Sequence, residues 1–456
     1  MGPWTIFLAL VILGAVGYYL GRSKALAWAN AREAHSVTGY HGTYTAIWGF
    51  LPGAILALLW GIFAPRAIDQ MVLGGIPAEE QPTTSQEIGV LLAEIKNIAS
   101  GAFGQRDDFL GAAADSFNAM NAASGWILFV LVVALGCVGV FYALSKLGPV
   151  FRARHSVERV VMVFLVICAT IAILTTLGIV LSLLFESLRF FSRVPFTDFL
   201  FGLQWSPQTS IRADQVGSSG SFGAVPLFAG TLLISAIALL VAVPLGLMAA
   251  IYLSDYASRR VRAVVKPLLE VLAGIPTVVY GFFAILTVAP VVRDLGTSIG
   301  LSVSANSALA AGLVMGIMIV PFVSSLSDDV INAVPQSLRD GSAAMGATKS
   351  ETMRQVVLPA ALPGIVGAVL LAASRAIGET MIVVMAAGLA ANLTANPFAA
   401  VTTVTVQIAT LLVGDQEFDS PKTLSVFALG LVLFVVTLIL NVIALRIVQT
   451  YREKYD

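Results

Sequence analysis

Charged side chains are scarce in this sequence of 456 residues. Only 11% of the residues are Asp, Glu, Lys or Arg, whereas 58% are hydrophobic, and soluble domains carry about 25% charged residues. Because so few charges cannot solvate the surface of a packed globule of this size, an ordinary soluble protein is excluded. The formal net charge of zero also removes any electrostatic basis for binding nucleic acid.

Cysteine and histidine are nearly absent as well. The two cysteines, Cys137 and Cys168, lie inside apolar runs, so we expect neither a disulfide framework nor a metal site. The three histidines lie in short polar segments without a cysteine or carboxylate cluster beside them, and we interpret them as interfacial: His35, His41 and His155. We therefore expect no metal and no cofactor.

The motifs of common catalytic sites are also missing. The sequence contains no G-x-x-x-x-G-K-[ST] loop that could cradle the phosphates of ATP, and no G-x-S-x-G, H-E-x-x-H or CxxC pair. We therefore expect that the chain is not an enzyme and does not itself hydrolyse ATP.

Long hydrophobic runs are what the sequence has in abundance. A helix needs about 20 mostly apolar residues to cross the ~30 Å hydrocarbon core of a bilayer. Nine segments meet this need and predict an all-α polytopic membrane protein: 3–20, 44–63, 125–144, 160–185, 225–253, 264–290, 306–327, 361–391 and 424–446. In the first, Arg22 and Lys24 follow the apolar run, which is the wrong charge order for a secretory signal, so we expect a retained helix.

Positive charge predicts the orientation of these spans. Basic residues outnumber acidic ones in segments 21–43, 145–159 and 254–266 and in the C-terminal tail. Nine spans place all of these on the cytoplasmic side and leave segment 64–124, which is acidic on balance, outside. We expect a multi-pass protein of the bacterial inner membrane with a periplasmic N-terminus and a cytoplasmic C-terminus.

The spans fall into two blocks. Residues 1–145 form a three-helix membrane extension with the long periplasmic loop 64–124, and residues 155–456 contain six spans. The loop is rich in Ala, Gly and acids and could not bury much core alone. We therefore interpret it as helical or loop-like decoration rather than as the ligand domain of a membrane sensor.

Three G-x-x-x-G motifs occur at Gly17–Gly21, Gly49–Gly53 and Gly312–Gly316. Their small residues permit close contact between membrane helices. The same motif also arises by chance in a glycine-rich membrane chain, so the pattern alone leaves both interpretations open.

The polar segment 328–363 lies between the seventh and eighth spans. Pro335 and the run Gln336–Met345 predict a short helix that ends at Gly346. Thr348 or Ser350 could cap a second helix, Glu351–Val357, which should stop before Pro359 because the residue before a proline avoids the helical region. A helix–turn–helix here would be a docking element, and an amphipathic interfacial loop is the alternative.

Arg375 and Glu379 are the only charged residues near the middle of any span in the six-span block. A centred charge costs ~2.5–3.5 kcal/mol on insertion scales. At i and i+4 of one helix the two could pair, either as a structural ion pair or as a substrate or gating site. The arginine fork suits a tetrahedral oxyanion such as phosphate or sulfate, with Glu379 as its counter-ion. Thr277 and Thr380 are candidate helpers by location.

The 328–363 segment resembles the cytoplasmic coupling motif of ABC importer permeases. That motif reads E-A-A, three residues, Gly, nine residues, a hydrophobic residue, any residue and Leu-Pro. The matching positions here are Asp340-Gly341-Ser342, Gly346 and Val356-Val357-Leu358-Pro359. The spacing matches fully, whereas Asp replaces Glu and Gly-Ser replaces Ala-Ala in the opening triplet.

A closer resemblance, over about residues 155–450, is to the PstC family of phosphate-importer permeases. It is carried by three segments in order: 273–281 (AGIPTVVYG), 334–339 (VPQSLR) and 374–381 (SRAIGETM). Residues 1–145 look like an extension found in some members. The resemblance implies a six-helix type I ABC permease core within 225–446 and a coupling loop at 328–363.

The same resemblance implies function and partners. The chain would be the permease subunit of an ATP-driven phosphate importer, with a PstA-like permease, two PstB-like ATPase subunits and a PstS-like periplasmic phosphate-binding protein. Arg375 would be offered to phosphate, with Glu379, Thr277 and Thr380 on the pathway. The loop residues implied to couple to the ATPase are Asp340, Gly341, Ser342, Gly346, Val356, Leu358 and Pro359.

Two alternatives remain. The chain could be a permease for another oxyanion such as sulfate or molybdate, since Arg375 alone does not separate these anions. It could instead be a secondary transporter driven by an ion gradient, with Glu379 as the proton or sodium site, although this leaves the spacing of the coupling loop unexplained.

Overall fold

The structure, a computed structural model, describes residues 3–30, 35–76, 84–101, 108–207, 220–413 and 419–451. In these ranges nine helices are long and apolar enough to span a membrane, and strand is confined to the short pair β1 (Trp205–Ser206) and β2 (Ser221–Phe222). The prediction of an all-α polytopic membrane protein is confirmed. Parts of the predicted periplasmic loop (77–83 and 102–107), of the first basic segment (31–34) and of the basic tail (452–456) lie outside the described residues.

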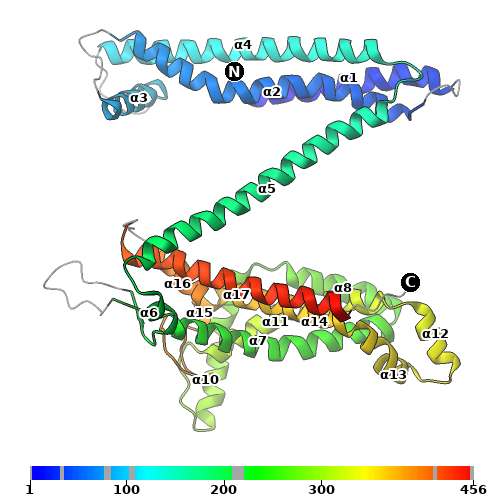
Figure 1. Ribbon diagram of the computed structural model, residues 1–456, viewed down its shortest axis with the longest axis vertical. Coiled ribbons are helices and arrows are strands. Elements are labelled where there is room, and N and C mark those ends of the chain that lie inside the picture. The colour runs from blue at the N-terminus through cyan, green and yellow to red at the C-terminus, as the bar shows by residue number, and fades with distance from the viewer. Residues whose placement is uncertain are drawn as a thin grey trace. The chain divides into compact units, whose positions relative to one another are not determined.

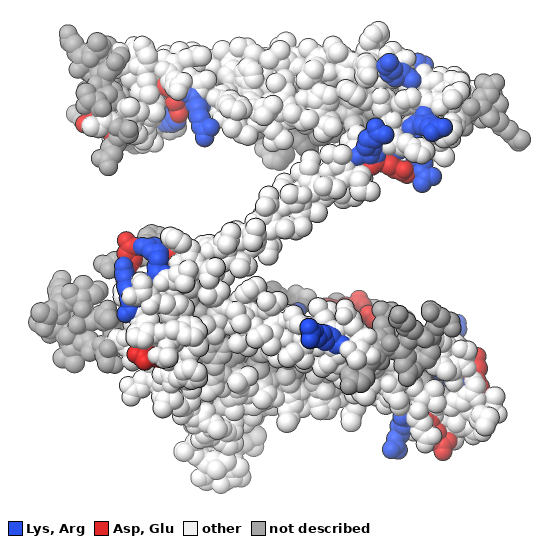
Figure 2. Space-filling model, viewed as in Figure 1, with Lys and Arg blue, Asp and Glu red and all other residues white. Residues whose placement is uncertain are grey.

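Charged side chains gather near helix ends. In each part of the molecule, Figure 2 shows the flanks of the long helices almost free of Lys, Arg, Asp and Glu on the face drawn. Such apolar flanks suit contact with lipid, because a charge at the bilayer centre is costly.

The chain divides into two compact units, Met1–Ile173 and Leu174–Asp456. Unit 1 contains α1 (Pro3–Asn30), α2 (Thr38–Gly74), α3 (Ser85–Ala99) and α4 (Asp108–Lys146). Helix α5 (Ala153–Phe191) begins in unit 1 and ends in unit 2. Helices α1, α2 and α4 pack side by side (Figure 1), and much of the predicted loop 64–124 is helical.

A small apolar core attaches α3 to α2 and α4. Ile95 of α3 is fully buried and packs in one cluster with Ile68 and Val72 of α2 and Leu110 of α4. The N-terminus of α3 is closed by a capping box, in which Thr84 and Glu87 each accept a backbone hydrogen bond from the other. Segment 64–124 therefore has a defined helical core of its own.

Glycines bring the helices of unit 1 into backbone contact. A Cβ atom at Gly21 of α1 would lie 2.7 Å from the backbone oxygen of His41 in α2. A Cβ atom at Gly49 of α2 would lie 2.8 Å from a methyl carbon of Val140 in α4. Real Cβ atoms do not approach so closely, so these motifs mark specific helix contacts rather than chance spacing.

Unit 2 is a bundle centred on one helix. Its elements after α5 are α6 (Phe196–Phe201), α7 (Val225–Ile251), η2 (Tyr252–Tyr256), α8 (Arg259–Ala273), α9 (Thr277–Phe283), η3 (Ala284–Val288), α10 (Ala289–Ser298), α11 (Ala308–Asn332), α12 (Gln336–Ala344), α13 (Lys349–Thr352), η4 (Met353–Val357), α14 (Leu358–Gly378), α15 (Met381–Ala386), α16 (Val404–Leu411) and α17 (Pro421–Tyr451). Helix α11 packs against α7, α14, α9 and α15. The core lies around its buried residues Met315 and Ile319.

The sixth predicted span, 264–290, is wrong at its start. Helix α8 ends at Ala273, the chain turns at Gly274, and Pro276 becomes the N-cap of α9. The proline disfavours a helical residue before it, and α8 carries a charged stripe at i, i+4 and i+8: Arg262, Lys266 and Glu270. The span therefore runs from α9 through η3 to α10.

The eighth predicted span and the second coupling helix also differ. The helix predicted over Glu351–Val357 does not stop before Pro359, because α13 continues through the π-helical turn η4 into α14. Pro359 fits there since it occupies the first turn of α14, where its missing N–H is tolerated. At the other end, α14 stops at Gly378 instead of running to residue 391.

Gly316 in the third G-x-x-x-G motif gives a test of close packing. A Cβ atom there would lie 2.9 Å from the backbone oxygen of Ala238 and 2.9 Å from Cβ of Val241, both in α7. We expect Gly316→Val to destabilise the protein by about 1–3 kcal/mol through overpacking, seen as a lower midpoint of thermal unfolding in detergent. Gly178→Val is the matched control, because no atom lies within 4 Å of a Cβ built at Gly178. Equal shifts for the two variants would contradict this account of the motif.

Candidate functional site

The predicted central residues lie at a break between two helices. Arg375 is in the last turn of α14, which ends at Gly378. Glu379 has an extended backbone (ψ 134°), and α15 begins two residues later at Met381. The end of a membrane helix within a protein is tolerated where neighbouring groups satisfy the freed backbone atoms.

Glu379 supplies two of these neighbouring groups. Its Oε1 atom accepts hydrogen bonds from the backbone N–H of Met381 at 3.1 Å and of Ile382 at 3.5 Å, so its carboxylate caps the start of α15. Its backbone oxygen accepts a 2.8 Å hydrogen bond from the hydroxyl of Thr405 in α16. The side chain and backbone of Glu379 are therefore both used to hold the break together.

Arg375 does not form the predicted ion pair. Among the described residues, no salt bridge joins Arg375 to Glu379. The prediction assumed one continuous helix, whereas α14 ends between the two residues and Glu379 turns toward α15. The exposed guanidinium of Arg375 instead lies 5.6 Å from the ring centre of Phe322 in α11, a cation–π contact.

The two predicted helper threonines lie on adjoining elements. Thr380 is half-buried between α14 and α15, and its hydroxyl is 3.4 Å from the backbone oxygen of Gly378. Thr277 is the first residue of α9. Helix α9 packs tightly on α15, since a Cβ atom at Gly281 would lie 2.6 Å from Sδ of Met385. The structure thus brings the helix of Thr277 beside the helix that follows Thr380.

Sequence reasoning missed the threonines that support this break from α16. Thr403 is the N-cap of α16, where its hydroxyl accepts from the N–H of Val406 at 3.4 Å. The same hydroxyl lies 3.0 Å from that of Thr405. A threonine directly before an apolar helical pattern is an N-cap signal, so the start of α16 could have been found from sequence.

The helix–turn–helix predicted over 328–363 is present. Helix α12 ends at Ala344, and Gly346 just after it lies in the left-handed region (φ +88°). The backbone N–H groups of Gly346 and Ala347 donate to the oxygens of Ala343 at 3.0 Å and Ser342 at 3.2 Å. This is a Schellman motif. Thr348 caps α13 in a capping box with Glu351.

The motif triplet lies on an exposed helix. Asp340 accepts a 3.0 Å hydrogen bond from Gln336 within α12, and no atom lies within 4 Å of a Cβ built at Gly341. The hydroxyls of Ser342 and Thr352 are 2.8 Å apart and join α12 to α13. At the turn, 89% of Met345 is exposed.

The closing residues of the motif face inward or lie at the start of α14. Val357 is fully buried in the cluster that holds α12 and α14 to the ends of α7 and α11. Val356 and Leu358 are half-buried, and Pro359 is exposed. The turn at Gly346 is therefore exposed, while the buried side of its flanking helices packs against the ends of α7 and α11.

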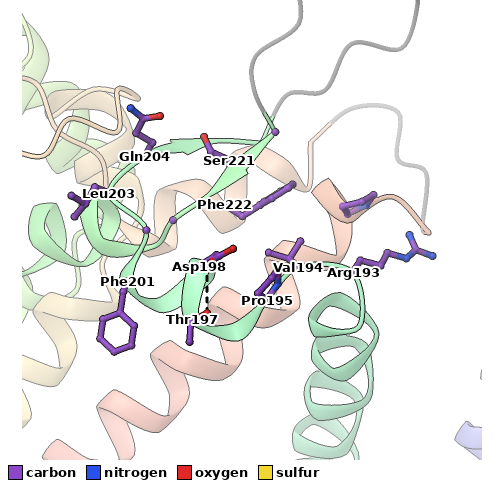
Figure 3. A pocket seen from close by; sticks show the side chains of 14 residues that line it. Arg193, Val194, Pro195, Thr197, Asp198, Phe201, Leu203, Gln204, Ser221 and Phe222 are labelled. Atoms are coloured by element: carbon purple, nitrogen blue, oxygen red, sulfur yellow. Dashed lines mark hydrogen bonds between the residues drawn. The ribbon is translucent and has the colours of Figure 1, made fainter.

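At the end of unit 2 opposite to α12 and α13 (Figure 1), the residues around α6 line a cavity of about 950 Å³ (Figure 3). It lies among the end of α5, helix α6, the β1–β2 pair and Pro421 at the start of α17. Its polar lining comprises Arg193, Thr197, Asp198, Gln204 and Ser221. Arg193 also donates to the backbone oxygen of Asp419.

Comparison with known proteins places these features in a family. Residues 7–175 match a family described as "Phosphate ATP-binding cassette transporter", and residues 242–453 match the family "Binding-protein-dependent transport system inner membrane component". The probable ABC transporter permease protein YqgH of Bacillus subtilis is 33% identical over 288 residues, which is 63% of this chain and 89% of the relative. The phosphate transport system permease protein PstC of Mesorhizobium japonicum is 36% identical over 295 residues, 60% of this chain and 85% of the relative.

This chain belongs to the PstC-like family of ABC transporter permeases. The resemblance inferred from three sequence segments is thereby confirmed, and the chain is a permease component of an ABC importer. Both the helix break at Arg375 and the coupling loop fall within the 242–453 match. Residues of unit 1 fall in the separate 7–175 match.

Gly346 of this permease gives a test of the coupling loop. No atom lies within 4 Å of a Cβ built there, so a substitution costs only the strain of a positive φ, about 1–2 kcal/mol for a residue other than Gly or Asn. We expect Gly346→Val to misplace the turn and weaken co-purification of the ATPase with the permease, whereas Gly346→Asn should keep it. Equal recovery of the ATPase with both variants would show that the turn does not dock it.

Proposed function

We propose that this chain is the permease subunit of an ATP-driven phosphate importer of the bacterial inner membrane. It forms the translocation path with a PstA-like permease. A PstB-like ATPase dimer docks on the coupling loop, and a periplasmic phosphate-binding protein delivers the anion. The N-terminus is periplasmic and the C-terminus cytoplasmic. The names of its relatives support phosphate as the substrate class.

The main structural support for this proposal is the exposed side chain of Arg375. An arginine in the apolar part of a bundle needs an anionic partner, and Glu379, its predicted counter-ion, is occupied as the cap of α15. The planar guanidinium presents five N–H donors in a fork that matches the oxygens of a tetrahedral anion. Phe322 lies 5.6 Å from the guanidinium in a cation–π contact, which does not use the N–H donors that would bind the anion.

The two ends of unit 2 fit the remaining parts of this function. The exposed turn at Met345 and Gly346 is where the ATPase docks. The cavity lined by Arg193 and Gln204 lies at the opposite end, where the binding protein approaches. A permease for another oxyanion is the second candidate, because the N–H donors of Arg375 would also bind sulfate.

Uptake of labelled phosphate into proteoliposomes tests the function. The vesicles would contain this chain, its permease partner and the ATPase, with binding protein outside and ATP inside. We expect ATP-dependent uptake that excess sulfate does not compete away. Transport of a different anion would overturn phosphate as the substrate, and uptake without ATP would favour an ion-coupled transporter.

Arg375 is tested in the same vesicles. We expect Arg375→Ala to lower ATP-dependent uptake by about 10- to 100-fold, because hydrogen bonds to charged groups contribute about 1.5–3 kcal/mol, while the complex stays assembled. Arg375→Lys should recover only part of the rate, since lysine lacks the fork. Arg293→Ala, at an exposed arginine of α10, is the matched control. Near-normal uptake by Arg375→Ala would rule out the substrate role.

A further inference from the structure

The coupling helix α12 is tied to the bundle by the side chain of Arg339, in addition to the packing of Leu338 against the apolar cluster around Val357. None of the residues of α12 is buried. Arg339 reaches back from it with only 13% of its side chain exposed. Its Nη1 lies 2.6 Å from Oδ1 of Asp255 in the η2 turn after α7, and its Nη2 donates to the backbone oxygen of Ile331 in α11 at 2.9 Å. Through these two contacts of Arg339, a displacement of α12 would also displace the ends of α7 and α11.

The buried carboxylate of Asp328 lies in α11, about one helical turn before Ile331. The side chain of Asp328 is only 3% exposed. Its two oxygens accept hydrogen bonds from Nη2 of Arg262 at 3.2 and 3.0 Å, from Nζ of Lys266 at 2.9 Å and from Nδ2 of Asn332 at 2.8 Å. Asn332 Oδ1 in turn accepts a 3.4 Å hydrogen bond from Ser254 of η2. This network joins α8 to the same ends of α7 and α11 that hold Arg339.

Apart from these polar contacts to Asp328, helix α8 is weakly packed against the rest of unit 2. None of its residues is buried, so its two charged contacts to Asp328 are strong attachments relative to its packing. A cavity of about 210 Å³ separates parts of α8 and α11 and is lined by Lys266, Glu270, Phe322 and Asp328. The cavity leaves room for α8 to shift while Arg262 and Lys266 stay bound to the carboxylate of Asp328.

The far end of α8 is joined to the pathway. The hydroxyl of Tyr280 in α9 donates to the backbone oxygen of Leu272 at 2.9 Å, across the turn at Pro276. This bond ties α9 to the last turn of α8. Helix α9 then packs on α15 through Gly281, next to the break that contains Glu379.

We infer that Asp328 is a positioning residue that transmits displacement of the coupling helix α12 through α8 and α9 to the helix break at Arg375. This inference rests on the proposed ATP-driven import. The chain of contacts runs from Arg339 through the Asp328 network to α8, and from Tyr280 to α15. Hydrogen-bond and salt-bridge networks between helices carry energetic coupling between distant sites.

The alternative is a purely structural role for Asp328. Buried ion pairs are weak evidence for stability on their own, and removing one partner can unfold a protein. The two roles differ in the ratio of phosphate transported to ATP hydrolysed. Loss of folding lowers both rates together, whereas loss of transmission lowers transport while the ATPase continues.

Asp328→Asn and Asp329→Asn are a matched pair for this test. The two carboxylates are adjacent, yet Asp329 is 65% exposed and lies 3.5 Å from Lys266, so solvent screens it. Phosphate uptake and ATP hydrolysis would be measured in the same proteoliposomes of the whole complex. We expect Asp328→Asn to lower the ratio of transport to hydrolysis by about fivefold or more and Asp329→Asn to leave it at the wild-type value.

Each outcome decides the inference. A wild-type ratio in assembled Asp328→Asn, or a proportional loss of both rates, overturns transmission. If Asp328→Asn does not assemble, Arg262→Gln decides in its place, because Lys266 and Asn332 still bind the carboxylate; a lowered ratio supports transmission and an unchanged one overturns it. Failure of the wild-type complex to import phosphate with ATP instead refutes the proposed function, and the inference with it.

Discussion

Satisfaction of backbone hydrogen bonds where α14 ends is the constraint on which the candidate site depends. Hydrocarbon offers no partner for a free N–H or C=O group, so an interrupted span must find partners within the protein. At the break after Gly378, the carboxylate of Glu379 caps α15 and the hydroxyl of Thr405 binds the freed carbonyl. This commits the carboxylate of Glu379 to the backbone of α15, and among the described residues Arg375 has no salt bridge to Glu379. The guanidinium donors are the group to which we propose that the transported anion binds. The same hydrogen bonds that hold the break together thus keep the carboxylate of Glu379 on α15 rather than on Arg375.

Packing density then determines which elements of unit 2 can move. Helices α7 and α11 meet through glycines that admit no side chain, and α11 is largely buried. Such close-packed contacts transmit force without yielding. Helices α8 and α12 have no buried residues. Polar contacts join α8 to Asp328 and join Arg339 of α12 to Asp255, beside the packing of Leu338. The close-packed part of the bundle is therefore apolar, whereas charged contacts join the two exposed helices to it, as the proposed transmission requires.

Sequence predicted what depends on local pattern and missed what depends on contacts between distant segments. Hydropathy found nine spans, and turn chemistry found α12 and its end at Gly346. The predicted ion pair of Arg375 and Glu379 was wrong, because residues at i and i+4 face each other only on a continuous helix and α14 ends at Gly378. Asp328 was included in the polar loop, since its partners on α8 are more than 60 residues away. Nothing in a single sequence distinguishes a buried acid with such partners from an acid at a helix end.

The departure of this chain from the family triplet shows which part of the coupling motif determines its shape. Replacing Ala-Ala by Gly341-Ser342 removes a methyl group at a position with no neighbour and adds a hydroxyl that binds Thr352 at 2.8 Å. The serine thus gains a polar link between α12 and α13. The turn itself is formed by the left-handed Gly346 and the capping box of Thr348, both outside the triplet. Since local backbone chemistry forms the turn, the triplet is free to vary on the exposed surface where we propose that the ATPase docks.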